Sequence, residues 1–81
     1  MAAGDARDVI RHIRTEAAAL VRRVNQGCTG AEPWFPAKVA EVTEALVCRL
    51  IAELQFGLAR PDLARKIERA AELEGAVTWQ D

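Results

Sequence analysis

The stretch PAKVAEVTEALVCRLIAELQFG (residues 36–57) decides the fold, because it reads as one long helix between a start and a stop signal. Pro36 suits the first helical position, where its missing N–H would have no partner, and Gly57 is a typical C-terminal stop. Apolar residues recur three or four positions apart, which is the period of a helix face. The stripe consists of Val39, Val42, Leu46, Leu50 and Leu54, widened by Val47, Ile51 and Leu58. A stripe this wide predicts a central helix that packs on two sides.

The segment before it, residues 5–25, carries a heptad seam, a row of apolar residues spaced alternately four and three positions apart. The seam consists of Ala6, Ile10, Ile13, Ala17, Leu20 and Val24. Asp5 is a favoured N-cap residue, and Arg22 and Arg23 fall in the last turn, where cations stabilise the helix dipole. The pattern predicts a helix over 5–25, and a seam of this kind is typical of helices that pair with another helix.

The rest of the chain divides into a loop, a third helix and a tail. Residues 26–35 contain two glycines and one of the three prolines, so they predict a loop. Residues 61–74 begin with proline and are followed by glycine, the same start and stop signals as in the central segment, so they predict a helix. Residues 76–81, which include Trp79, are too short for an element of their own and predict a short extended tail.

Together these segments predict an all-α fold, a single helical domain over residues 1–81. We expect a small three-helix unit with antiparallel helices at about 5–25, 36–56 and 61–74, because short connections favour antiparallel neighbours. A chain of 81 residues can build only a small core, although 51% of its residues are hydrophobic. We therefore expect the unit to complete its bundle by dimerisation or by binding a partner.

The charges nearly balance, with eleven basic and twelve acidic residues and a net charge of −1. Dedicated nucleic-acid or membrane-surface proteins gain affinity from a clear basic excess, which this chain lacks. The distribution is uneven, because residues 1–25 carry a net +2, residues 26–60 a net −1 and residues 61–81 a net −2. The basic first segment is thus suited to pair with the acidic last one, either within the chain or head to tail between two copies.

Two of the four aromatic residues, Trp34 and Phe35, stand side by side between prolines. One interpretation is architectural, in which they close one end of the bundle, joined there by Trp79 from the tail. The other is functional, in which Trp34 is exposed and anchors a partner, as tryptophan often does in interfaces. The sequence leaves both open.

The residue sets that catalysis or metal binding requires are not found. The chain has one histidine, His12, and two cysteines, Cys28 and Cys48, whereas a zinc site needs four nitrogen or sulfur ligands in a local pattern. Serine and tyrosine are absent, and no glycine-rich loop is followed by the lysine of a phosphate site. We expect Cys28 to be exposed and Cys48 to be half-buried. No enzyme activity, cofactor, metal or small-molecule substrate is predicted.

Three arginines, Arg7, Arg11 and Arg14, fall on one side of the first helix, and Arg22 follows them. They suit an acidic partner or phosphate, which gives the alternative function of a small dimeric nucleic-acid-binding regulator. The other interpretation is a solvated flank with local partners such as Asp8.

The sequence therefore predicts a non-enzymatic protein–protein interaction module, a self-associating subunit or adaptor of a larger complex. Two cysteines without a signal peptide, and no apolar run long enough for a membrane span, favour an intracellular, cytoplasmic or nuclear location. The expected partner is another protein or a second copy of the chain. The residues predicted to bind it are Ile10, Ile13, Leu20, Val24, Trp34, Phe35, Leu46 and Leu50.

Overall fold

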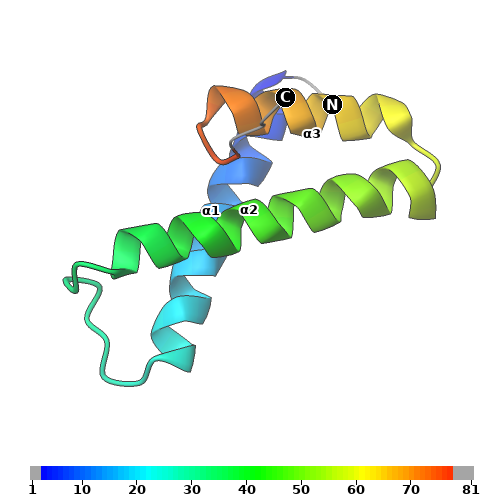
Figure 1. The fold of residues 1–81 in the computed structure, drawn as a ribbon. Helices are drawn as coiled ribbons and strands as arrows, with labels where there is room; N and C mark the ends of the chain where they lie inside the picture. The colour runs from blue at the N-terminus through cyan, green and yellow to red at the C-terminus, as the bar shows by residue number, and fades with distance from the viewer. Residues whose placement is uncertain (1–2, 78–81) are drawn as a thin grey trace.

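The computed structural model describes residues 3–77, which form three helices in the order expected (Figure 1). The helices are α1 (Ala3–Val24), α2 (Phe35–Ala52) and α3 (Pro61–Leu73), and α2 continues into a single π-helical turn, η1 (Glu53–Gly57). The all-α, three-helix prediction is confirmed, and residues 3–77 contain no β-strand. Proline stands in the first turn of both α2 and α3, as the sequence predicted.

The three helices do not lie side by side. Helices α2 and α3 run in opposite directions, whereas α1 crosses both of them (Figure 1). The first half of α1 packs with α3, where Ala6 and Ile10 share a cluster with Ile67. Its second half packs with α2, where Ala17 shares a cluster with Phe35. Because α1 crosses its neighbours instead of running alongside one of them, its apolar seam packs against two different helices.

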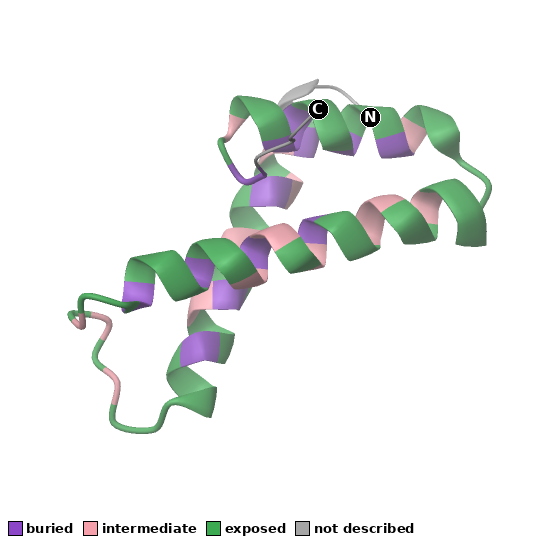
Figure 2. Cartoon of the chain, in the orientation of Figure 1, coloured by how far each residue is buried: buried purple, intermediate pink, exposed green. Residues whose placement is uncertain are grey.

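Small side chains dominate the core, whose buried residues are coloured purple in Figure 2. Alanine supplies six of the thirteen buried hydrophobic residues, and the others are mainly valine and isoleucine. The six alanines are Ala6, Ala17, Ala64, Ala70, Ala71 and Ala76. Residues without a long side chain let helix backbones approach closely, and each leaves little apolar area to bury. The core is therefore tight but small.

The leucines lie outside this core. The chain has seven, Leu20, Leu46, Leu50, Leu54, Leu58, Leu63 and Leu73, and none of them is buried. Leucine is among the residues most often buried in folded proteins, so this placement is unusual. The accessible surface is correspondingly large at 5564 Å², whereas a compact monomer of this mass exposes about 4,800 Å².

The junction between α2 and α3 departs from the predicted helix end. The Leu58 N–H donates to the Glu53 carbonyl over 2.9 Å, a π-helical bond, and the Arg60 N–H donates to the Leu54 carbonyl over 2.7 Å. Ala59 then takes a positive φ of 51°. The prediction that Leu58 widens the buried stripe of α2 is wrong, because the wider turn and the reversal after it leave Leu58 67% exposed.

Helix α3 ends at the predicted glycine. Gly75 has a φ of 66°, the Ala76 N–H donates to the Ala71 carbonyl, and the Gly75 N–H donates to the Glu72 carbonyl. This is the Schellman arrangement, for which glycine is preferred at the left-handed position. It turns the chain so that Ala76 and Val77 are buried in the core. The rest of the predicted tail, with Trp79, lies outside the described residues.

Candidate interaction surfaces

Two of the eight residues predicted to bind a partner are buried within the chain. Ile10 is 0% exposed and lies between α1 and α3, and Phe35 is 7% exposed and packs on Ala17 and Val21. Side chains that are already enclosed have almost no area left for another molecule. The assignment of Ile10 and Phe35 to a partner surface is therefore corrected, and both serve the core.

The other six remain accessible to different degrees. Leu20, Val24 and Trp34 are 40%, 72% and 43% exposed. Ile13, Leu46 and Leu50 are half-buried, each packed against the edge of a core cluster. The heptad seam of α1 therefore has two parts. Its first part lies inside the molecule, and its last turns, at Leu20 and Val24, are exposed and belong to neither core cluster.

Phe35 and Trp34 differ in their placement, because Phe35 is buried in the core and Trp34 is exposed. Phe35 closes the α1–α2 cluster, with the guanidinium of Arg22 over its ring at 5.0 Å, in the range of a cation–π contact. Trp34 lies against the outside of Phe35, with ring centroids 6.2 Å apart and planes inclined at 57°. Phe35 is thus the architectural residue, and Trp34 keeps an open face.

Three arginines of α1 converge on the C-terminal end of α3. Arg7 Nε donates to Glu74 Oε1 over 2.6 Å, and Arg11 Nη2 lies 3.3 Å from the same oxygen. Arg14 Nη2 donates to the backbone carbonyl of Glu74 over 2.8 Å. The hydrogen bond from Arg7, and then the charge of Arg11, lower the pKa of the Glu74 carboxyl, although its partial burial acts the other way. The three cations meet a carboxylate and the negative end of a helix dipole together.

This arrangement bears on the alternative of a nucleic-acid binder. Three of the four arginines that would contact phosphates are bound to Glu74, whose side chain is only 10% exposed, and the fourth, Arg22, lies over Phe35. A phosphate would have to compete with a carboxylate that the fold holds in place. The charge distribution left open whether the basic first segment pairs with the acidic last one within the chain or between two copies. These contacts make the pairing within the chain.

The loop between α1 and α2 is built around the Glu32 carboxylate. Its Oε1 accepts a hydrogen bond from the Thr29 N–H at 3.1 Å, and its Oε2 accepts from the Gly30 N–H at 3.0 Å and the Cys28 thiol at 3.1 Å. These bonds, the one from Cys28 first, lower the pKa of Glu32 to about 2. Gly30 has a φ of 89°, and a Cβ there would lie 3.2 Å from Arg22 Nη2. The loop therefore requires glycine at this position.

The Glu32 contacts predict a specific acid sensitivity. Because the folded-state pKa lies below the ordinary value of 4.5, the stabilising contribution of Glu32 is fully present above about pH 4.5 and is lost as the pH falls towards 2. We expect Glu32→Gln to lower the thermal midpoint at pH 7 but not at pH 2. Thermal unfolding followed by circular dichroism between these values checks this. Glu72→Gln is the matched control, because Glu72 is exposed and has no ion pair within residues 5–77. An equal shift of the thermal midpoint in both variants would contradict the prediction.

The predicted exposure of the two thiols, Cys28 exposed and Cys48 half-buried, is wrong for both. Cys28 is half-buried under its loop, and Cys48 is exposed on α2. Partial burial, and then the hydrogen bond to Glu32, raise the pKa of the Cys28 thiol, and a thiol that stays protonated is a poor nucleophile. Among the described residues, no three His, Cys, Asp or Glu side chains lie close enough to hold a metal ion.

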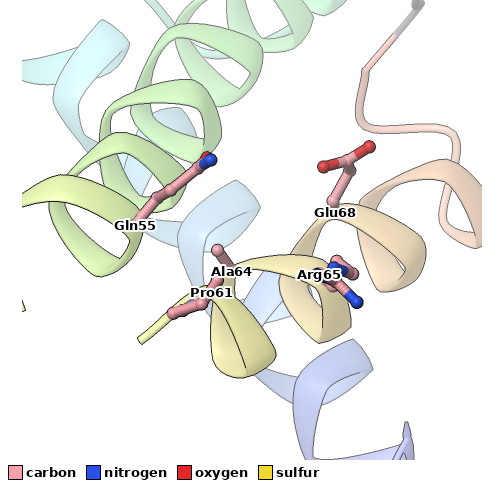
Figure 3. Close-up of a pocket in the computed structure, with 5 residues that line it drawn as sticks. All are labelled: Gln55, Pro61, Ala64, Arg65 and Glu68. Carbon is pink, nitrogen blue, oxygen red and sulfur yellow. The ribbon is translucent and has the colours of Figure 1, made fainter. Parts of the chain in front are cut away.

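An open groove lies between η1 and α3 (Figure 3). Gln55 and Glu68 point into it from opposite sides, Ala64 and Pro61 lie between them, and Arg65 stands at its edge. These side chains offer one carboxylate, one guanidinium and one amide, without a nucleophile or a histidine. The groove is a polar crevice between two helices rather than an arrangement of reacting groups.

One exposed apolar patch was missed by sequence reasoning. Phe56 and Leu58, at the junction of η1 and α3, are 79% and 67% exposed, and Phe56 is the most exposed of the large hydrophobic residues in the described chain. The nearby Gly57 was the available signal, because a helix stop beside two large apolar residues leaves them near a helix end. Helical periodicity instead placed Leu58 on the buried face.

Within residues 3–77, no helix combines the length and apolar character needed to cross a membrane. The chain matches no protein-family model, and the comparisons with curated proteins and with solved structures find no similar protein.

Proposed function

We propose that this chain is a non-enzymatic helical interaction module that self-associates and serves as a subunit or adaptor of a larger complex. The observation that carries the proposal is the inverted placement of its apolar residues. Alanines fill the core, while all seven leucines are half-buried or exposed. A chain that places its largest aliphatic side chains outside gains most of their hydrophobic stabilisation only when another surface covers them.

The surface area supports the same proposal. The excess over a compact monomer of equal mass is about 760 Å², close to the area of about 800 Å² that each partner buries in a standard interface. The radius of gyration is 13.5 Å, against about 12 Å for a compact domain of this length. Both values fit a protomer whose shape is completed by association.

We propose that the contact uses the free part of the heptad seam, Leu20 and Val24, with Ile13, Leu46 and Leu50 at its border and Trp34 as a further anchor. The proposal involves no catalysis, in keeping with the protonated state favoured for the Cys28 thiol. It involves no nucleic acid either, in keeping with the engagement of Arg7, Arg11 and Arg14 by Glu74.

The mass in solution tests the proposal. Light scattering during gel filtration is expected to give a mass above that of the 8.9 kDa chain, rising with concentration. Leu20→Asp is expected to return it to the monomer, because a charge in an apolar contact loses its hydration. The control is Ala19→Asp, which places the same charge on an exposed position of α1 away from the seam. A wild-type chain that stays monomeric at every concentration would refute self-association, and an unchanged mass for Leu20→Asp would refute this surface.

A further inference from the structure

We infer that two copies of this chain pair in an antiparallel contact with two-fold symmetry, formed by the exposed flank of α1. The flank consists of Leu20 and Val24, with the charged residues Glu16 and Arg23 beside them. The contact is centred on Leu20, and Glu16 of each copy meets Arg23 of the other. The inference rests on the proposed self-association and specifies its geometry, namely which way the two helices run and at what size the assembly stops.

Leu20 and Val24 form the apolar part of this flank. They lie about one helical turn apart and are 40% and 72% exposed. The half-buried Ile13 continues the flank towards the N-terminus, about two turns before Leu20. Figure 1 shows that the last part of α1 extends beyond α2, so a second helix can lie along it.

Glu16 and Arg23 form a charged row along the same flank. They are seven positions apart, which is close to two full turns, so they lie on one side of α1 and about 10 Å apart. Both are exposed. Within residues 5–77 Arg23 makes no ion pair, and the one ionisable partner of Glu16 is His12, at 4.0 Å. The row therefore offers one carboxylate and one guanidinium to a partner.

The order of these two charges decides how the helices run. In a parallel pair Glu16 would face Glu16 and Arg23 would face Arg23, and like charges facing each other oppose association. In an antiparallel pair, each carboxylate faces a guanidinium of the other copy, so the contact gains two attractions. Charges that flank an apolar seam set the orientation of paired helices in this way. The axis that relates the two pairs passes between positions 19 and 20, which places Leu20 at the centre.

The charges on neighbouring elements do not disturb this pairing. Arg22 lies over the aromatic ring that closes the α1–α2 cluster. On α2, Lys38 Nζ lies 3.7 Å from Glu41 Oε2, so these two charges compensate each other. Arg49 and Glu53 are exposed, opposite in charge and four positions apart, which is about one turn. With cations and carboxylates matched on α2, Glu16 and Arg23 are the charges that determine the fit.

The surface area favours a closed dimer over a growing chain. A two-fold contact uses the same surface of both copies and is complete at two, whereas a head-to-tail chain needs two different surfaces on every copy. The accessible surface exceeds that of a compact monomer by about 760 Å², close to the area of about 800 Å² that one partner buries in a standard interface. The excess thus matches one interface per chain. We expect association to stop at twice the mass of the 8.9 kDa chain.

Reversing each charge tests the pairing. Glu16→Arg and Arg23→Glu are each expected to weaken association by about tenfold, because the symmetry turns two attractions into two repulsions. Mixed in equal amounts, the two variants are expected to recover the wild-type affinity to within about threefold, since one row is then wholly basic and the other wholly acidic. Light scattering during gel filtration measures the mass, and circular dichroism checks that both variants fold. The control is Arg69→Glu, which makes the same charge change on an exposed position of α3.

The possible outcomes separate this inference from the proposed function. If the wild-type chain associates but the mixture is as weak as the single variants, self-association stands and the pairing of Glu16 with Arg23 is wrong. A wild-type mass that rises beyond the dimer would overturn the two-fold contact in the same way. Equal weakening by Arg69→Glu would also overturn it, since the net charge alone would then explain the effect. If the wild-type chain is monomeric at every concentration, both proposals fail.

Disulfide trapping provides a second readout, of the axis itself. In the inferred contact the two Leu20 positions are offset by only about 1.5 Å along the helices, whereas the two Val24 positions are about 13 Å apart. A disulfide joins Cα atoms less than about 7 Å apart. In a chain carrying Cys28→Ser and Cys48→Ser, we therefore expect Leu20→Cys to give a covalent dimer with oxidised glutathione and Val24→Cys to give none. Equal cross-linking at both positions would indicate a parallel pair and overturn the inference, as would no cross-linking at Leu20→Cys.

Discussion

Replacing Ile10 by alanine is expected to lower the free energy of unfolding by about 2–4 kcal/mol, the range for truncating a fully buried isoleucine. Ile10 is 0% exposed and shares a cluster with residues of α2, α3 and the segment after α3. The lost methyl groups would leave a cavity where helices from three parts of the chain meet. Urea denaturation followed by circular dichroism measures the change.

Leu20→Ala is the matched control for this prediction. Both residues belong to the heptad seam of α1, but Leu20 is 40% exposed and lies beyond the core. Its truncation should cost less than about 1 kcal/mol in the monomer while weakening association. If Ile10→Ala instead changed the mass in solution and left the urea midpoint unmoved, the assignment of Ile10 to the core would be wrong.

Enlarging Ala17 to leucine is expected to destabilise the fold by about 1–3 kcal/mol, because it forces extra atoms into a closely packed crossing. Ala17 is 0% exposed and lies in the cluster formed by α1 and α2. Its small size is what lets the two helices approach there. Thermal unfolding of the variant measures the effect.

Ala19→Leu is the control, since Ala19 lies two positions along the same helix and is exposed. The same substitution there should change the stability by less than about 0.5 kcal/mol. Equal effects at both positions would mean that the crossing has room for a larger side chain and that alanine there does not set the distance between the helices.

The helices themselves followed from local signals in the sequence. Prolines at 36 and 61 and the glycine at 75 mark real helix ends, because their backbone preferences act within a single turn. The apolar period of α1 predicted the face that holds Ile10 and Ala17. These features depend on neighbours in the chain and not on how the helices are arranged.

The arrangement, and with it the exposed surfaces, did not follow from the sequence. A heptad seam is equally compatible with a partner in the same chain and one in another chain, so Ile10 and Leu20 looked alike. Their difference arises where α1 crosses α2, a property of the tertiary packing (Figure 2). The π-helical turn that exposes Leu58 likewise has no signal in helical periodicity, which assumes a constant advance per residue.

The contacts between α1 and Glu74 affect when the protein can fold during its synthesis. The bonds from Arg7 and Arg14 join residues 67 and 60 positions apart, in a chain of 81 residues. During synthesis, the first helix emerges before the residues that pin it exist, so the core cannot close until Glu74 has left the ribosome. We expect the three helices to pack together only after the last of them has emerged. The long closure adds little entropic cost, since that cost grows only with the logarithm of the loop length. It does leave part of the apolar face of the first helix uncovered until the third helix has been made.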